Sequence, residues 1–412
     1  IQDNKIKRRA CMKSTSYTLW GSELSPFYLK VQACLRFHTY TVNYQPQQGG
    51  YFRALKHQIK VELIQKRLKK ITWPIMSSQD ELPLVPYMFN ENGQSFYDSS
   101  AFAHWLDQSP DNKHLPLSQF DDKSLEFVVA LIDEYADEFG LYMVHHMRWK
   151  FSALDNTAGQ RLANEFKIIL GPFKWFIEKS FPKRQVRRLP YLFSVAPKDF
   201  QIESLPKSLQ PPVHSDFPAT HDLLENAYIN LLAALESKLA TSPYLLGSSF
   251  TLADASIYGQ LGMNLADPSA AQFIQKQAPK TYKWLQIIQQ GKFTYAQKLD
   301  LKIDDSIKAL LTEIKRLYIP LMQQNAQAYE QHYQQGQRLF NEKAFDKHTA
   351  LYEGKLDGIS FKSVAKSFQV SSWQALLKRW NSLNEAEQAR ISNIIQLDLT
   401  GETTSNELTG LG

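Results

Sequence analysis

A serine followed by proline, just after a short β-prone run, constrains the first part of the chain most. The run Tyr17–Trp20 favours a strand, and Gly21 ends it. Apolar residues at helical spacing then follow Pro26, namely Phe27, Val31, Cys34 and Leu35. Because serine at the N-cap and proline at the first helical position mark a helix start, Ser25 is predicted to lie on a strand-to-helix turn. Free N–H groups and the helix dipole there favour an anion, although helix capping alone would also account for Ser25.

A second piece, Val85-Pro86, accompanies two runs that favour strands. The runs are Leu82–Phe89 and Gln94–Tyr97, and Asn90–Gly93 is predicted to form the hairpin turn between them. A proline at the mouth of a strand usually marks an edge or a bulge. A cis proline would instead free the N–H and C=O of Val85 to pair with an extended ligand. The sequence leaves both interpretations open.

A third piece, Asp98-Ser99-Ser100, ends the second of these runs and opens a helical pattern. It is interpreted as another N-cap, with an acidic residue just outside the helix. Its N–H groups would hold a ligand carboxylate, while Asp98 would hold a ligand ammonium. Helix capping alone is again the alternative.

In this order and at these spacings, the three pieces resemble the glutathione-binding domain of the glutathione S-transferase superfamily. The resemblance consists of an S-P-F turn after the first strand, V-P before the third, and D-S at the end of the fourth. It covers residues 17–108 and continues at Leu245–Asp254. There Thr251-x-x-Asp254 is a capping box, which in this family opens a core helix of the second domain. The chain is most similar to a serine-type, bacterial-like member with a long C-terminal helical extension.

The resemblance implies an α/β plus all-α architecture. A tail at 1–16 precedes a thioredoxin-like glutathione-binding domain at 17–108, then a helical domain at 109–295 and a helical extension at 296–412. Seven prolines between 182 and 218 predict a surface excursion without helix inside the second domain. In the extension, 305–345, Phe361–Trp380 and Glu385–Leu399 are expected to be helical.

Residues 51–70 are predicted to form a lysine-rich helix that is longer than the family usually carries at this place. Its apolar face comprises Phe52, Leu55, Ile59, Leu63 and Leu68. Its lysines are interpreted as a solvated face rather than as a ligand site. They are Lys56, Lys60, Lys66, Lys69 and Lys70.

Composition limits which kinds of partner and which cellular compartment are expected. The 412 residues carry a net charge of +6 that is spread along the chain, so no nucleic-acid partner is expected. No apolar run approaches the length of a membrane span, so no membrane partner is expected. The two cysteines, Cys11 and Cys34, give no disulfide framework, which fits a reducing compartment and predicts a cytoplasmic location. The basic segment Ile1–Ala10 is not followed by an apolar stretch and is no secretory signal.

The resemblance also assigns chemistry to the first turn. Glutathione reacts as its thiolate, and a hydroxyl near a helix N-terminus favours that ion. In serine-type classes this hydroxyl corresponds to Ser25, and Ser22 on the same turn is the alternative. The backbone of Val85, beside Pro86, is expected to pair with the cysteinyl part of glutathione. Asp98 and Ser99 are expected to hold its γ-glutamyl end.

Other chemistries have little support. The turn lacks both cysteines of a dithiol motif, since it is Ser25-Pro26-Phe27-Tyr28, which excludes dithiol exchange there. No metal site is expected, because the adjacent His145 and His146 would face different directions on a helix. Tyr135, His146 and Trp149 are candidates for an electrophile pocket, with core packing as the alternative.

We therefore expect a detoxifying glutathione transferase with glutathione as cosubstrate and a small hydrophobic electrophile as acceptor. The family's habit predicts a homodimer. The alternative is a non-catalytic protein that keeps the fold and holds a partner, which the long additions would favour.

Overall fold

The structure, a computed structural model, describes residues 16–75, 85–109, 112 and 114–399. Most of the predicted tail, including Cys11, lies outside the described residues, as do the first three residues of the run Leu82–Phe89. Residues 110 and 111, just after the predicted domain boundary at 108, also lie outside them.

A four-stranded sheet with three helices forms the N-terminal domain. Its elements in chain order are β1 (Ser16–Trp20), α1 (Pro26–Phe37), β2 (Thr41–Gln45), α2 (Tyr51–Gln65), β3 (Tyr87–Asn90), β4 (Ser95–Phe96) and α3 (Ser99–Gln108). The strand order is β2-β1-β3-β4, with β2 parallel to β1 and the other neighbours antiparallel. This is the thioredoxin-like arrangement that the sequence predicted.

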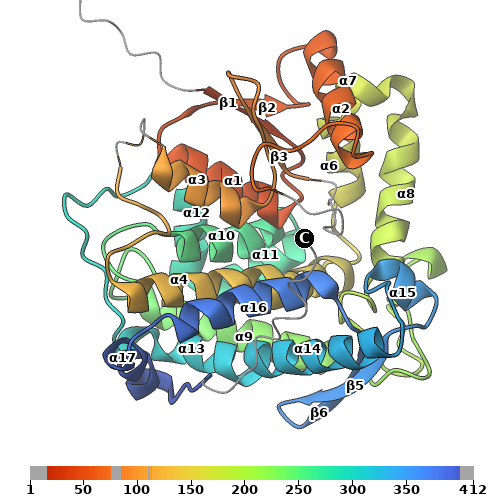
Figure 1. Ribbon diagram of the computed structural model, residues 1–412. Coiled ribbons are helices and arrows are strands. Elements are labelled where there is room, and N and C mark those ends of the chain that lie inside the picture. Colours follow the sequence, from red (N-terminus) through yellow and green to blue (C-terminus); the bar gives the residue numbers. More distant parts are fainter. Residues whose placement is uncertain (1–15, 76–84, 110–111, 113, 400–412) are drawn as a thin grey trace, which may run out of the picture.

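Successive side chains of a strand point to opposite faces of the sheet, so the two faces pack against different helices. The side chains that join the main core beside α1 and α3 are those of Leu19, Met88 and Phe96. Those on the other face, which pack with Val61 and Ile64 of α2, are Trp20, Tyr87 and Phe89. Figure 1 shows α2 on the outer side of the sheet, with α1 and α3 between the sheet and the helices below.

The helical domain begins with a long rod made of α4 (Lys123–Tyr135), the π-helical turn η1 (Ala136–Gly140), α5 (Leu141–His146) and the π-helical turn η2 (Met147–Phe151). A hairpin follows, made of α6 (Ala158–Glu165), α7 (Lys167–Leu170), η3 (Gly171–Phe173) and α8 (Lys174–Arg187). The later helices are α9 (His221–Lys238), α10 (Leu252–Asn264), α11 (Pro268–Gln277) and α12 (Pro279–Gln289).

Helix α10 is buried along its whole length and joins the two domains. A Cβ on Gly259 would lie 2.5 Å from the carbonyl oxygen of Pro26, at the first turn of α1. Only glycine permits this approach, so α10 holds the start of α1 in place. At the other end of α10, the predicted capping box is present, with Asp254 accepting a hydrogen bond from the N–H of Thr251 at 2.9 Å.

The expectation of no helix between 182 and 218 is wrong at its start, because α8 continues through Pro182 to Arg187. Proline removes the N–H that would bond the carbonyl of Glu178. Gly159 of α6 comes so close that a Cβ would lie 2.3 Å from that carbonyl oxygen and 2.8 Å from the Pro182 ring. The neighbouring helix thus covers the backbone group that Pro182 leaves unpaired. Residues 189–220, all of them described, contain one short 3₁₀ turn, η4 (Lys207–Leu209).

The C-terminal residues are mostly helical but include a hairpin that was not predicted. Their elements are η5 (Asp305–Ile307), α13 (Lys308–Glu313), η6 (Ile314–Tyr318), α14 (Ile319–Gln334), α15 (Glu342–Asp346), β5 (Leu351–Leu356), β6 (Ile359–Val364), α16 (Ser367–Asn381) and α17 (Glu385–Ile395). Asp357 and Gly358 both have positive φ, at 50° and 78°, which is the two-residue turn that suits a hairpin. The helix expected from Phe361 therefore begins only at Ser367.

These C-terminal elements share the core of the helical domain. The ring of Phe127 in α4 lies 5.2 Å from the ring of Trp380 in α16. Lys366 is buried and donates hydrogen bonds to the carbonyl of Tyr191 at 3.1 Å and to the hydroxyl of Tyr142. Burial lowers the pKa of Lys366 to about 7. Within the described part of the chain, no helix combines the length and the apolar character needed to cross a bilayer.

Candidate functional site

Ser25 lies at the predicted place, on the turn between β1 and α1. It is the N-cap of α1, with φ −90° and ψ 125°, and its hydroxyl accepts a hydrogen bond from the N–H of Tyr28 at 3.4 Å. The side chain is half-buried. One long hydrogen bond leaves the Ser25 O–H free to donate to a further acceptor.

Ser22, the alternative on the same turn, has a different environment. It is buried, its hydroxyl accepts from the N–H of Leu24 at 3.1 Å, and it faces the carboxyl of Glu165 in α6, where it favours the ionised form and so opposes a rise in the Glu165 pKa. Burial raises the pKa of Glu165, and its Oε2 atom has no hydrogen-bond partner among the described residues. Of the two serines, Ser25 is the more accessible.

Val85 and Pro86 lie beside this turn. A Cβ on Gly21 would lie 3.2 Å from the Cβ of Val85 and 2.8 Å from the ring of Tyr28. The peptide bond between Val85 and Pro86 is cis. The strand-to-helix turn and the Val85-Pro86 segment therefore meet at the carboxyl end of β1.

The N-cap of α3 lies one residue earlier than the sequence predicted, at Asp98 instead of Ser99. Asp98 is itself the N-cap of α3 and accepts from the N–H of Ala101 at 2.8 Å, whereas Ser99 is the first helical residue and is buried. Asp98 has φ 66° and ψ 117°, a conformation that costs a non-glycine residue about 1–3 kcal/mol. Such strain persists where surrounding structure imposes it, often in a binding site.

A buried charge cluster below this corner escaped the sequence analysis. The ammonium of Lys30 donates to Asp133 at 2.5 Å, to Asp137 at 2.7 Å and to the hydroxyl of Ser100 at 2.7 Å. The other oxygen of Asp137, Oδ1, is buried and has no hydrogen-bond partner among the described residues. Burial raises the pKa of Asp137 to about 7, against the attraction of Lys30, and Asp98 lies near enough to add to the rise. The one signal in the sequence was a run with four carboxylates, 133–138, on an otherwise apolar helix.

The hairpin formed by α6, α7 and α8 covers this end of the sheet. The ring of Phe166 meets the ring of Trp20 edge-on, with 6.0 Å between the centroids. Phe166 and Ile169 belong to the same apolar cluster as Val85 and Tyr97. Val85 and this segment therefore pack against the same residues of the sheet and of α2.

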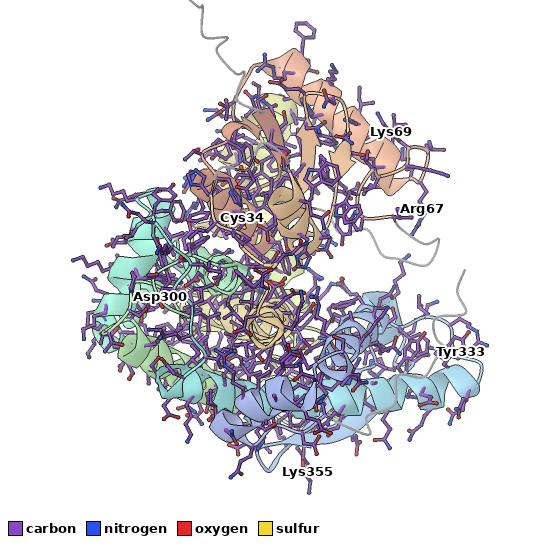
Figure 2. All side chains as sticks on the ribbon, turned by 60° about the vertical axis from the view of Figure 1, so that its left-hand side comes forward. Cys34, Arg67, Lys69, Asp300, Tyr333 and Lys355 are labelled. Carbon is purple, nitrogen blue, oxygen red and sulfur yellow. The ribbon has the colours of Figure 1, made fainter. Side chains whose placement is uncertain are left out.

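The three candidates for an electrophile pocket are buried side chains. His146 hydrogen-bonds the hydroxyl of Ser194 at 2.7 Å and Glu225 at 3.0 Å. The Tyr135 ring stacks on Phe139, and Trp149 packs edge-on against Phe181. His145 turns away from His146 and bonds the carbonyl of Leu141. Cys34, labelled in Figure 2, is also buried, and burial raises the pKa of its thiol, as expected of a structural cysteine.

Comparison with known families bears on the helical half. Residues 218–286, from just before α9 into α12, match the family model described as glutathione S-transferase, C-terminal domain. Over these residues the chain is similar to the C-terminal domain of glutathione S-transferases. Its thioredoxin-like domain followed by a helical domain of this type is the arrangement that the sequence predicted.

Several solved structures resemble the chain at low identity. A glutathione S-transferase from Pseudomonas fluorescens Pf-5 is 14% identical, with a TM-score of 0.32, over 69% of this chain and 99% of that one. Glutathione transferase F7 from Populus trichocarpa is 13% identical, with a TM-score of 0.32, over 72% and 99%. The beta-etherase LigF from Sphingobium sp. strain SYK-6 is 15% identical, with a TM-score of 0.38, over 72% and 98%. A search of curated proteins found no match.

Proposed function

We propose that the protein is a glutathione transferase in which Ser25 stabilises the thiolate of glutathione. The observation that carries this proposal is the placement of Ser25: half-buried, at the N-terminus of α1, and on the turn whose Gly21 lies beside Val85. Its hydroxyl would donate to the sulfur, and the N-terminal end of α1 would favour the negative charge. The thiolate would then attack an electrophilic carbon of a small hydrophobic acceptor, forming a thioether as the leaving group departs or a strained ring opens.

We further propose how this chain would hold the tripeptide. The N–H and C=O of Val85 would pair with the cysteinyl part, and the N-terminus of α3, at Ser99, would hold the γ-glutamyl carboxylate. Asp98 would hold the γ-glutamyl ammonium. Asp137 is added to these residues, because its buried Oδ1 has no hydrogen-bond partner among the described residues and an ammonium could donate to it.

One observation favours the second candidate, a non-catalytic protein that keeps the fold. Phe166 and Ile169 pack against the same apolar cluster as Val85 and Tyr97, so the hairpin would lie over part of the proposed site. A protein that had stopped using glutathione could close the site in this way. The strained conformation of Asp98 argues for the enzyme, since a mere helix cap does not need it.

The test is glutathione binding by calorimetry together with conjugation to a panel of aryl halides, epoxides and peroxides. We expect Ser25→Ala to keep glutathione affinity but to lose conjugation by about 100-fold, as removal of an oriented donor to a developing anion does elsewhere. Ser371→Ala, an exposed serine on α16, is the matched control. If wild type and Ser25→Ala bind glutathione but are equally inactive, the non-catalytic candidate is favoured. If both are equally active, Ser22 or a water is the activator.

The remaining expectations stay predictions. They are the domain boundaries at 17–108, 109–295 and 296–412, a cytoplasmic location, a role in detoxification, and a homodimer. One observation bears on the location and another on the domain boundaries. The one described cysteine is buried and reduced, which suits a reducing compartment. The C-terminal elements share the core of the helical domain, which bears on the boundary at 295.

A further inference from the structure

Large apolar side chains are exposed together on α2 and on the hairpin that packs beside it. Phe52 in α2 is 85% exposed, Phe173 in η3 is 69% exposed, and Trp175 in α8 is 57% exposed. Tyr51, Ile59, Leu68 and Phe176 add to them. Helix α7 contacts α2 and leads through η3 into α8, so these side chains occupy neighbouring elements. Figure 1 shows α2, α7 and the start of α8 together at the upper right of the molecule.

Helix α8 is largely exposed along its length, although it packs against α6. Of its 14 residues, only Val186 is buried. Each large apolar side chain left in water forgoes about 1.5–3 kcal/mol of burial free energy. Several large apolar side chains exposed on neighbouring elements usually mark an interaction site.

The same elements concentrate positive charge. Residues 51–70 and 167–184 hold twelve Lys and Arg but only two acidic side chains, Glu62 and Glu178. That leaves 35 of the 47 basic and 39 of the 41 acidic side chains for the rest of the chain, which is therefore net negative. Figure 2 shows Arg67 and Lys69 at the outer edge of the N-terminal domain. Burial, together with repulsion from Lys69 and Lys56, lowers the pKa of Lys60 to about 8.

We propose that α2, α7 and α8 dock on the surface of a bilayer that contains anionic phospholipid. Lysines and arginines would lie at the headgroups, and Phe52, Phe173 and Trp175 would enter the boundary with the acyl chains, as on helices that lie in the plane of a membrane. The earlier expectation of no membrane partner rested on the lack of a spanning segment. Docking on a surface needs no such segment.

The observations favour a membrane over other anionic partners. Nucleic acid would use the basic side chains and could stack on the aromatic rings, but the exposed Ile59 and Leu68 offer no stacking face. A second copy that met this surface with its own would bring like charges together. Aliphatic, aromatic and basic side chains on one surface are the combination that a headgroup layer accepts.

The test is co-sedimentation of the full chain with vesicles, either of phosphatidylcholine alone or of equal parts phosphatidylcholine and phosphatidylglycerol. We expect binding to the anionic vesicles, weakened by salt, and little binding to phosphatidylcholine. Lys174→Glu with Lys179→Glu should weaken binding about tenfold or more, since each lysine near such a surface contributes about 1 kcal/mol. Trp175→Ser with Phe176→Ser should weaken it comparably.

Matched controls come from α16, where Phe368→Ser and Lys378→Glu change an exposed apolar and an exposed basic side chain outside the surface. They should bind as wild type does. Thermal unfolding of each variant checks that the fold is kept, because every changed side chain is exposed. Equal binding to both vesicle types, unaltered binding by the α8 variants, or binding to duplex or single-stranded nucleic acid without sedimentation on vesicles would overturn the proposal. None of these outcomes depends on glutathione binding or on Ser25.

Discussion

At the scale of residues, single side chains stabilise this fold by accepting hydrogen bonds from backbone N–H groups at helix starts. Asp254 is fully buried and accepts from the N–H groups of Leu245 at 2.8 Å and Thr251 at 2.9 Å. Burial raises the pKa of Asp254 to about 6, although these hydrogen bonds favour its ionised form. Glu387 makes the same kind of capping box at the exposed start of α17, where Asn384 donates to it at 2.9 Å. The two boxes share one motif but differ in burial.

Burial should therefore decide what each box contributes to stability. We expect Asp254→Ala to lower the free energy of unfolding by about 3 kcal/mol or more, because it leaves two buried N–H groups without an acceptor. Glu387→Ala should cost about 1 kcal/mol or less, because water replaces its hydrogen bonds. Urea unfolding of both variants measures the difference, and equal losses would contradict this account.

The sequence predicted where residues lie in helices and turns better than it predicted which distant residues they contact. Ser25-Pro26 and Thr251-x-x-Asp254 announce helix starts through local chemistry, so their places could be derived. The link from Lys30 to Asp133 and Asp137 could not, since it joins residues more than a hundred positions apart whose helices must first be packed. Asp98 was correctly placed at the start of a helix, but its positive φ is imposed by its surroundings and has no local signal.

At the scale of elements, the hairpin of α6 to α8 is the main departure from expectation. Pro182 predicted a break because proline opposes helix locally, whereas Gly159 of the neighbouring helix makes room for the unpaired carbonyl of Glu178. The same hairpin brings Phe166 and Ile169 to the apolar cluster at the edge of the proposed site. The packing of α6 on α8 thus permits the helix to continue through Pro182. The same hairpin covers the sheet at Trp20.

This cover should compete with glutathione. We expect Phe166→Ala to lower the Kd for glutathione several-fold, because the ring packs against the same apolar cluster as Val85 and Tyr97 and would compete there with the tripeptide. Calorimetry on the variant gives the Kd directly. Phe173→Ala is the matched control, since Phe173 lies on the same hairpin but is 69% exposed and outside the cluster. An unchanged Kd in Phe166→Ala would show that the segment does not limit access.

At the scale of the whole molecule, one apolar core runs from the sheet through the helical domain to α17. It includes Leu19 of β1, Ile257 of α10 and Ile391 of α17. The predicted boundary at residue 295 rests on the resemblance to a family, and a resemblance carries no information on what the additional residues contact. The hairpin of β5 and β6, by contrast, has a local signal in the sequence, the Asp357-Gly358 turn, so its place could be predicted from the sequence alone.

Because the core is shared, a destabilising substitution in the C-terminal elements should also destabilise the helical domain. Trp380 is buried in α16 and meets Phe127 of α4, so Trp380→Ala should lower the free energy of unfolding by about 3–5 kcal/mol. Backbone amides of α4 and α5 should lose protection from hydrogen exchange in the same variant, because their helices lose a packing surface. Trp175→Ala in α8 is the control, since that ring is 57% exposed and should cost little. Loss of protection confined to residues after 296, with α4 unaffected, would mean that the C-terminal elements unfold on their own and that the shared core does not act as one cooperative unit.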